Sequence, residues 1–517
     1  MRGRHEEERL LRRGADERAQ GGEVAENDTG VGRPAEAAPP RLPPHLPASD
    51  TQCHSGTMDS PASPGLAAAW VALSGDPALL TRVTRQQDPG VLAARLPVRE
   101  LAAACAGACG LAAAELVSVR DGGPVPRVRL NDRAVAAAFA SERLSRVAGD
   151  APESFAPLSR FWRTADGWVR THANYPHHRA RLLGALGLGA AAGPEDVAAV
   201  LRRRAARETE EAVYAAGGLA VALRAPGEWR AGPQAKVLEA LPLVSAGRID
   251  DAPRRVFGTP GGGLPLAGVR VLDLTRVLAG PVATRTLALL GADVLRIDPP
   301  GMPELAAQQA DTGLGKRSAL LDLRECGGLR RFEELLAEAD VVVTGYRPGA
   351  LERCGLTPDG LAARRPGLVL AQVSAWGRSG PWGQRRGFDS LVQAATGIAA
   401  VEANREGRPG TLPAQALDHG TGYLLAAGVL RALTGQTRTG GTRLVRLALA
   451  RTVAWLLSGP RSPAPAEVPP PPEEHTAERD SDWGRLRYAL PAFSYEGGPA
   501  DWARPSVPSG TDDARWW

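Results

Sequence analysis

The sequence predicts an α/β fold: a Rossmann-like parallel sheet with helices on both faces, plus a smaller, mostly helical α+β domain. Two observations support it. From residue 268 onward, short apolar runs such as VRVLDL and DVLRID alternate with helical segments, a pattern typical of a parallel sheet covered on both faces. From about 65 to 245, the chain is instead rich in alanine and has the periodicity of amphipathic helices.

Composition divides the 517 residues into four parts. Residues 1–57 are charged and then rich in proline, so we expect a disordered extension, with Met58 as the natural start of the chain. Residues 58–250 hold the smaller alanine-rich domain, and residues 265–455 hold the sheet. Residues 460–517 are expected to form a Pro-rich linker and a partly ordered tail.

The smaller domain contains one predicted hairpin among its helices. TADGWVRTH places an Asp-Gly turn between two short strand-like runs. His172, His177 and His178 lie at the end of this hairpin and just after it. A metal site would need further ligands beside them, so surface or packing histidines are the favoured interpretation.

Five apolar runs predict the strands of the sheet: VRVLDL, DVLRID, SALLDL, DVVVTGY and LVLAQVSAWG. The helices between them are PVATRTLALL, which has Pro281 at its start, LRRFEELLAEA and GLAARRP. Ligands of such sheets bind beyond the carboxyl ends of the strands. We therefore expect the site to be lined by the loops that follow the strands, at 275–281, 298–301, 345–355 and 374–383.

The motifs of two common nucleotide-binding classes do not occur in the expected places. Asp298 ends the second strand, as a ribose-binding carboxylate would, but the first turn, TRVLAGP, lacks the G-x-G-x-x-G that cradles a pyrophosphate. GLGKRS around Lys316 lacks the spacing of a P-loop, and Arg317 follows the lysine where Ser or Thr is needed. NAD-dependent and kinase-like functions are therefore disfavoured.

Net charge and cysteine usage indicate which classes of partner and which cellular compartment to expect. The net charge of +5 arises from arginines scattered among acidic residues, with few aromatic residues between them. This pattern argues against nucleic acid and is compatible with a groove for an anionic small molecule. The five cysteines lack the paired spacing of a disulfide framework, so we expect reduced thiols and a cytoplasmic protein. We find no apolar run long enough to span a membrane, and no secretory signal.

Five segments that occur in order over about 265 to 455 resemble one family. They are PLAGVRVLDLTRVLAGPVATRTLALLGADVLRIDPPG, GKRSALLDL, GYRPGALERCGL, SAWGRSGPWGQRRGFDSLVQAATGI and ALDHGTGYLLAAGVLRAL. Together they are similar to the family III CoA-transferases, the CaiB/BaiF type. FWRTADGWV, RLLGALG and GEWRAG resemble the half that usually follows the sheet domain in that family. Here this half comes first, so the resemblance implies a rearranged two-half version.

Asp418 stands at the entrance to an apolar helical run, where an aspartate is by itself typical of a helix N-cap. The resemblance implies a second role, as the nucleophile that attacks the thioester carbonyl of an acyl-CoA and then carries CoA as an aspartyl thioester. Desolvation and orientation make a carboxylate effective in this role, and we expect the helix dipole to hold it ionised. Gly420 and Gly422 are expected to let the backbone approach closely, with nearby N–H groups stabilising the oxyanion.

The resemblance also implies three groups of CoA-binding residues. The first lines the CoA pocket, the second lies near the CoA phosphates, and the third contacts the pantetheine and the diphosphate. They are Arg276, Val277, Leu278 and Ala279 in the first group, Lys316 and Arg317 in the second, and Tyr346, Arg347 and Arg353 in the third. Lys316 is one of only two lysines among 62 basic residues, which suggests a need for a compact ammonium. Arg347 and Arg353 are alternatively solvated surface charges.

Two departures from the family pattern bear on the reaction. Racemases of the family carry a histidine where Gly387-Phe388-Asp389 has Phe388, and a phenyl ring cannot exchange a proton. The glycine-rich loop that covers the intermediate in well-known transferases has no counterpart, which leaves transfer and hydrolysis as alternatives. The expected function is therefore CoA transfer, with a 2-methylacyl-CoA racemase-like isomerase and an inactive CoA-binding protein as the alternatives.

The resemblance finally implies the partners. They are an acyl-CoA and a carboxylic acid acceptor, so CoA is a substrate and no cofactor or metal is permanently bound. Family members form interlocked dimers, so the chain is expected either to form a homodimer or to close on itself.

Overall fold

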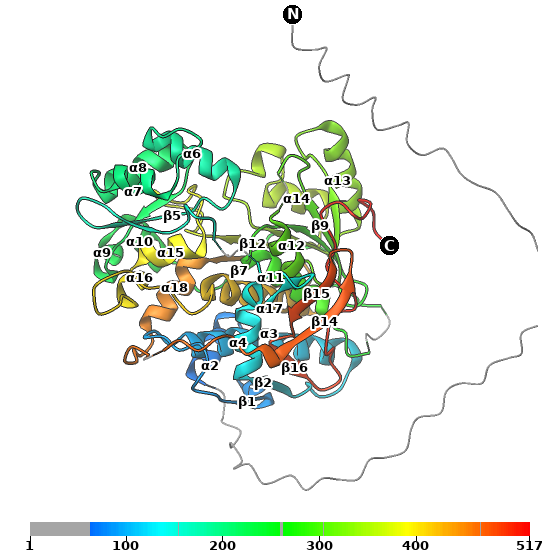
Figure 1. Ribbon diagram of the computed structural model, residues 1–517. Coiled ribbons are helices and arrows are strands. Elements are labelled where there is room, and N and C mark those ends of the chain that lie inside the picture. The colour runs from blue at the N-terminus through cyan, green and yellow to red at the C-terminus, as the bar shows by residue number, and fades with distance from the viewer. Residues whose placement is uncertain (1–62, 153–154, 259–261, 303, 466) are drawn as a thin grey trace, which may run out of the picture. The chain divides into compact units, whose positions relative to one another are not determined.

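The computed structural model describes residues 63–517, apart from short gaps at 153–154, 259–261, 303 and 466 (Figure 1). The expected extension over 1–57 and the expected start at Met58 lie outside the described residues. These described residues form one compact unit.

A seven-stranded sheet forms the centre of this unit, in the order β10-β9-β8-β11-β12-β13-β7. All neighbouring strands are parallel except β13 and β7, which are antiparallel. The strands are β7 (Ser245–Arg248), β8 (Arg270–Leu274), β9 (Asp293–Asp298), β10 (Arg317–Leu320), β11 (Val341–Thr344), β12 (Val369–Ser374) and β13 (Arg443–Ala448). The predicted α/β fold and its five predicted strands are therefore confirmed.

Helices cover both faces of the sheet. Successive side chains along a strand point alternately into the hydrophobic core on one face and the core on the other. Val341 and Val343 of β11 pack in the core that contains α11 (Ala279–Leu289) and α17 (Ala416–Thr439). Val342 faces the other way and packs with Phe332 of α13 (Cys326–Glu338). Figure 1 shows α13 and α14 (Pro358–Arg364) on the opposite side of the sheet from α11 and α17. Because both faces are buried, the strands read as continuous apolar runs rather than alternating ones.

Strands β13 and β7 extend the sheet beyond the five predicted strands. β7 comes from the part of the chain that precedes the sheet region and pairs along residues 443–446 of β13. Its sequence, SAGR, is short and mostly exposed, so it has no apolar pattern by which a strand is recognised. Such a short, polar strand is also a usual way to end a sheet at an exposed edge.

The alanine-rich helix α3 (Val98–Asp121) packs against α17 on the side away from the sheet. Among the described residues, it is the one helix long and apolar enough, by length and composition alone, to cross a membrane. The expectation that no such run exists is therefore wrong. The apolar composition is explained by packing, because 89% of that stretch is buried inside the fold.

The predicted hairpin is confirmed, and a small layered unit surrounds it. β4 (Phe161–Arg163) and β5 (Trp168–Thr171) are antiparallel, with β6 (Ala220–Ala222) paired on the other side of β5. The helices α6 (Pro176–Leu186), α7 (Pro194–Leu201) and α8 (Ala206–Ala215) cover this sheet. Trp162, Val169 and Leu182 belong to a core that these elements share.

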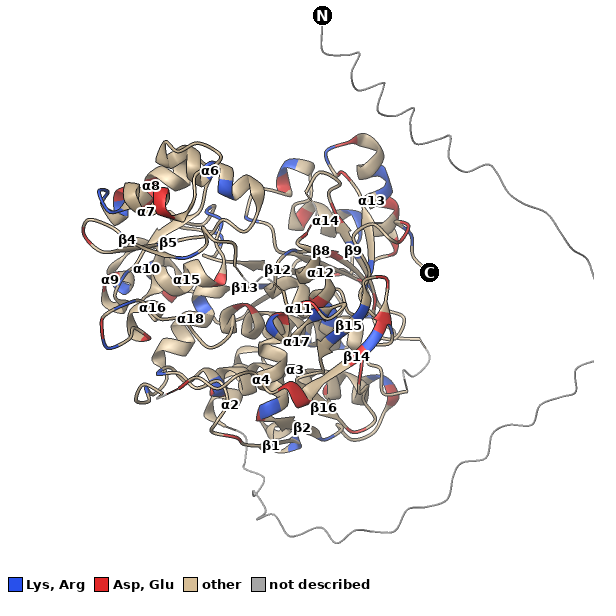
Figure 2. Ribbon diagram, viewed as in Figure 1, with Lys and Arg blue, Asp and Glu red and all other residues tan. Residues whose placement is uncertain are grey.

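Strands from the last part of the chain pair with strands from the first part of the described chain. β14 (Thr476–Ser481) and β15 (Gly484–Ala489) form a hairpin, and β15 pairs with β3 (Arg146–Val147). β16 (Phe493–Tyr495) pairs with β2 (Val128–Asn131), which is parallel to β1 (Val83–Gln86). Acidic and basic residues are interspersed over α13 and the β14–β15 hairpin in Figure 2, so neither element presents a uniformly basic face.

We expect Gly422→Ala to destabilise the protein. A Cβ at residue 422 would lie 2.6 Å from the carbonyl oxygen of Ala279 and 2.9 Å from Cβ of Val282, so α17 and α11 would have to separate. The expected loss in free energy of unfolding is about 1–3 kcal/mol, measured by denaturant unfolding. The matched control is Gly435→Ala in the same helix, where the nearest atom, of Arg443, is 3.9 Å away. Equal stability of the two variants would contradict this packing.

Candidate active site

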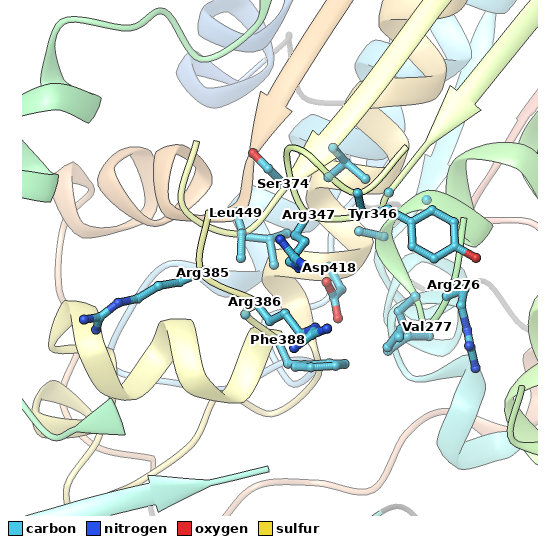
Figure 3. Close-up of a pocket in the computed structure, with 18 of the residues that line it drawn as sticks. Arg276, Val277, Tyr346, Arg347, Ser374, Arg385, Arg386, Phe388, Asp418 and Leu449 are labelled. Atoms are coloured by element: carbon cyan, nitrogen blue, oxygen red, sulfur yellow. The ribbon is translucent and has the colours of Figure 1, made fainter. Parts of the chain in front are cut away.

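A pocket of about 310 Å³ lies beyond the carboxyl ends of β8, β11 and β12. Of the four loops expected to line the site, those at 275–281, 345–355 and 374–383 contribute residues to its wall, and Met302 follows the fourth, at 298–301. Figure 3 shows Asp418 among these side chains. The pocket is therefore where the strand pattern predicts a ligand to bind.

Seven of the ten candidate residues line this one pocket. They come from three separate segments of the chain: the loop after β8, the loop after β11 and the first turn of α17. They are Arg276, Val277, Leu278, Ala279, Tyr346, Arg347 and Asp418. The sheet brings the three segments together, because the carboxyl ends of its parallel strands share one edge.

Lys316 and Arg317 do not reach the pocket, contrary to the expected contact with the CoA phosphates. The Lys316 Nζ lies 3.0 Å from Oδ2 of Asp273 and donates to the carbonyl of Pro281 at 3.0 Å. With 1% of its surface exposed, this ammonium is enclosed by its partners. Arg317 forms a bidentate pair with Asp293, and its side chain is equally buried. Both cations are therefore engaged within the fold.

Arg353 also lies away from the pocket. It belongs to a short 3-10 helix, Glu352–Cys354, at the far end of the loop after β11, and its side chain is exposed. The interpretation as a solvated surface charge fits Arg353. For Arg347 the structure favours the other interpretation, because its side chain is in the pocket wall.

Asp418 lies in the first turn of α17, but the N-terminal cap is provided by another residue. The Oδ2 atom of Asp389 accepts hydrogen bonds from the backbone N–H groups of Leu417 (2.9 Å) and Asp418 (3.0 Å). Within the described part of the chain, no donor bonds the Asp418 carboxyl group. The cap interpretation of Asp418 is thus wrong, and its side chain is left to face the pocket, with 6% of the residue exposed.

The same hydrogen bonds use backbone N–H groups that were expected to stabilise the oxyanion. The N–H groups of Leu417 and Asp418 are occupied by Asp389, and the N–H of His419 donates to the carbonyl of Gln415. These first-turn amides are therefore not available to a developing oxyanion. The close approach expected at Gly422 is confirmed by its contact with Ala279. A Cβ at Gly420 would have more room, since its nearest neighbours would be the Cys105 sulfur at 3.3 Å and Leu101 at 3.7 Å.

Asp418 is held in a setting that favours its neutral form. Burial raises its pKa well above the ordinary value, and the carboxylates of Asp389 and Glu142 raise it further. Burial also raises the pKa of Asp389, against the effect of the hydrogen bonds it accepts. Glu142 is placed by His419, whose Nε2 lies 2.9 Å from the Glu142 Oε2. The expectation that the helix dipole holds Asp418 ionised is not supported, because desolvation and two neighbouring acids raise its pKa.

The alanine-rich part of the chain supplies a wall of the pocket that the sequence did not indicate. Tyr175, His177 and His178, at the start of α6, line it beside Phe388. His172 is buried and stacks on Phe388, with ring centroids 3.8 Å apart. Among the described residues there is no group of three or more potential metal ligands. His172 thus packs in the fold, as interpreted, while His177 and His178 face the ligand space.

Arg386 is a second pocket residue that the sequence did not single out. Burial lowers its pKa, and the neighbouring Arg347 and Arg181 lower it further. No acidic partner within ion-pair distance accompanies Arg386 or Arg347 in the described part of the chain. Figure 3 shows both side chains extending toward Asp418. The abundance of arginine throughout the sequence hid Arg386. The surroundings of Arg386 and Arg347 favour an anionic ligand.

Comparison with known proteins identifies the region that carries this site. Residues 266–481 match the family model described as CoA-transferase family III. Over these residues the chain is similar to that family. It contains the loops after β8 and β11 and the whole of α17.

The relatives that we compare match part of this chain. A probable fatty acyl-CoA transferase, Rv3272, from Mycobacterium tuberculosis is 37% identical over 198 residues, which are 36% of this chain and 50% of that protein. The beta subunit of a succinyl-CoA–L-malate CoA-transferase from Chloroflexus aurantiacus is 36% identical over 203 residues, 37% of this chain and 50% of that protein. A crystal structure of Rv3272 covers 38% of this chain and 56% of its own, with 37% identity and a TM-score of 0.36. The chain thus spans about half the length of the curated relatives it matches.

We expect the reactivity of Asp418 toward a thioester to rise with pH. A carboxyl group attacks a carbonyl only in its ionised form, and the pKa of Asp418 is raised, so acid conditions keep the group protonated and unreactive. Asp389→Asn removes one charge that raises this pKa, so the acid limb of the profile should move to lower pH. The measurement is the rate of covalent adduct formation over a series from about pH 5 to 9. Glu406→Gln, at an exposed site, is the control and should leave the pH profile unchanged. If the pH profile of Asp389→Asn is the same as that of the wild type, Asp389 does not raise the pKa of Asp418.

Proposed function

We propose that the protein transfers CoA from an acyl-CoA to a carboxylic acid, with Asp418 as the covalent nucleophile. The observation that carries this proposal is the position of Asp418: its carboxyl group, without a hydrogen-bond donor in the described structure, faces a pocket whose wall contains the loops after β8 and β11. The similarity of residues 266–481 to CoA-transferase family III supports the same chemistry.

In the proposed reaction, the Asp418 carboxyl group is bonded first to the acyl group and then to CoA. After Asp418 loses its proton, an Oδ atom attacks the thioester carbonyl, the C–S bond breaks, and a mixed anhydride and CoA thiolate form. The thiolate attacks the aspartyl carbonyl, which releases the first acid and leaves an aspartyl-CoA thioester. The acceptor carboxylate then attacks that thioester and expels the thiolate, which captures the acceptor's carbonyl and returns Asp418 as a carboxylate.

The protein contributes orientation, exclusion of water and charge complementarity. Arg276, Val277, Leu278 and Ala279 would line the pantetheine, with Tyr346 beside them. Arg347 and Arg386, which lack acidic partners in the described structure, would meet the anionic groups of CoA. Arrival of a ligand carrying negative charges offsets the mutual repulsion of these two guanidinium groups. CoA enters as a substrate in this scheme, and no permanently bound cofactor is required.

Phe388 favours transfer over the racemase-like alternative. Its ring lies in the pocket wall and stacks on His172, so it offers no group for proton exchange at that place. The names of the two relatives specify a fatty acyl-CoA and a succinyl-CoA–malate pair, which supports a thioester and a carboxylic acid as the substrate classes here.

The assembly we propose is a chain that closes on itself. Tyr175, His177 and His178 come from the part of the chain that precedes the parallel strands, and Asp418 comes from α17, between β12 and β13, yet all four line one pocket of a single chain. In this proposal, the half that precedes the parallel strands supplies one wall of the site within the same chain. Sedimentation of the full chain would test this arrangement against the homodimer.

Asp418→Asn should abolish covalent trapping. The protein is incubated with a panel of acyl-CoA thioesters, treated with hydroxylamine, and the peptide that contains residue 418 is analysed by mass spectrometry. We expect a hydroxamate at Asp418 in the wild type and a fall in transfer rate of roughly 10³-fold or more for Asp418→Asn. Arg405→Gln, at an exposed position, serves as the control. Full activity of Asp418→Asn would refute the nucleophile, and wild-type protein without an adduct across the panel would favour an inactive CoA-binding protein.

A further inference from the structure

The backbone of Val277, in the loop after β8, adopts an unfavourable conformation that needs support. Its φ angle is 71°, in the left-handed region that β-branched residues rarely enter. Val277 lies in the pocket wall together with Arg276. The conformation therefore shapes the surface on which a ligand rests, and some other group must hold it there.

Glu304 provides this support. Its Oε2 atom accepts a hydrogen bond from the Val277 N–H at 3.0 Å, and lies 3.5 Å from Nε of Arg276 and 3.3 Å from Nη2 of Arg296. Its Oε1 atom accepts from the hydroxyl of Tyr175, which belongs to the alanine-rich part of the chain. Arg276 completes the group by placing its guanidinium 5.2 Å from the centre of the Tyr175 ring.

Glu304 is buried beside the pocket and touches no ligand space itself. Three of its partners, Tyr175, Arg276 and Val277, are pocket residues, whereas Glu304 is not. Figure 3 shows the Arg276 side chain turned away from Asp418, as its contacts with Glu304 and Tyr175 require. One carboxylate thus joins two distant segments of the chain at the wall of a single site.

The charge of Glu304 is essential to these contacts. Burial would raise its pKa, but the charges of Arg296 and Arg276 outweigh burial, and the pKa lies below its ordinary value. The group is therefore ionised at neutral pH. A carboxylate that accepts several charge-assisted hydrogen bonds at once holds its partners more firmly than neutral acceptors do.

We propose that Glu304 is a positioning residue for CoA binding: it holds the strained Val277 backbone and the Arg276 side chain in the shape that accepts CoA, and ties both to Tyr175. This inference rests on the proposed function, because it assumes that the pocket binds CoA. Without the carboxylate, Val277 would relax to a negative φ, and the wall formed by residues 276–277 would change shape. The reacting group, Asp418, stands on α17 and would keep its place.

The test compares Glu304→Ala, Glu304→Gln and Tyr175→Phe, with CoA itself as the probe in calorimetric titrations. Loss of charge-assisted hydrogen bonds predicts a rise in Kd of roughly 10- to 100-fold for Glu304→Ala. Glu304→Gln keeps one acceptor oxygen and should lie between it and the wild type. Tyr175→Phe, which removes a single bond, should raise Kd by about 3-fold or more. The rate of adduct formation at saturating acyl-CoA should stay close to wild type in all three, so that KM changes and kcat does not.

Glu338→Gln is the matched control, because Glu338 is exposed and pairs with Arg270 far from the pocket. If Glu304→Ala does not fold, Glu304→Gln and Tyr175→Phe decide the question. Unchanged Kd values in these two variants would overturn the proposal, as would a lower kcat with unchanged KM. Failure of the wild type to bind CoA would instead refute the proposed function, so the two failures are distinguishable.

Discussion

The hydrogen bonds between Asp389 and the first turn of α17 are the interaction on which the site depends. They satisfy two backbone N–H groups that a helix otherwise leaves unpaired. A neighbouring element thus does the capping, and the carboxyl group of Asp418 is left unengaged. The same contact brings a second carboxylate close to Asp418, which adds to the rise in pKa that burial causes. Asp389 therefore affects both the position and the protonation of the proposed nucleophile.

Packing around α17 explains how this arrangement is kept rigid. The helix lies between α3 and α11, and its small residues permit close contact: the backbone of Gly422 approaches Ala279 at the start of α11. Ala279 itself belongs to the pocket wall. The contact that orders the core therefore also sets the distance between the proposed nucleophile and the loop proposed to bind CoA.

The two basic residues that most resembled phosphate ligands have a different role. Lys316 offsets the charge of buried Asp273, and Arg317 offsets that of Asp293. A lysine retained in an arginine-rich sequence did indicate a special need, as inferred. The need is that of an enclosed ion pair, where a compact ammonium fits beside Asp273 and the carbonyl of Pro281. Two cations that line the pocket without an acidic partner in the described part of the chain are Arg347 and Arg386.

The sequence by itself determined the parallel sheet, the loops at its carboxyl edge and the motif that contains Asp418. Apolar strand runs and motif order are local properties, which can be read residue by residue. The tertiary structure alone decided that Asp389 caps α17, that Lys316 is enclosed, that Tyr175 and Arg386 face the pocket, and that β7 completes the sheet. Each of these depends on contacts between segments far apart in the chain, because desolvation and charge coupling arise only when folding brings such segments together.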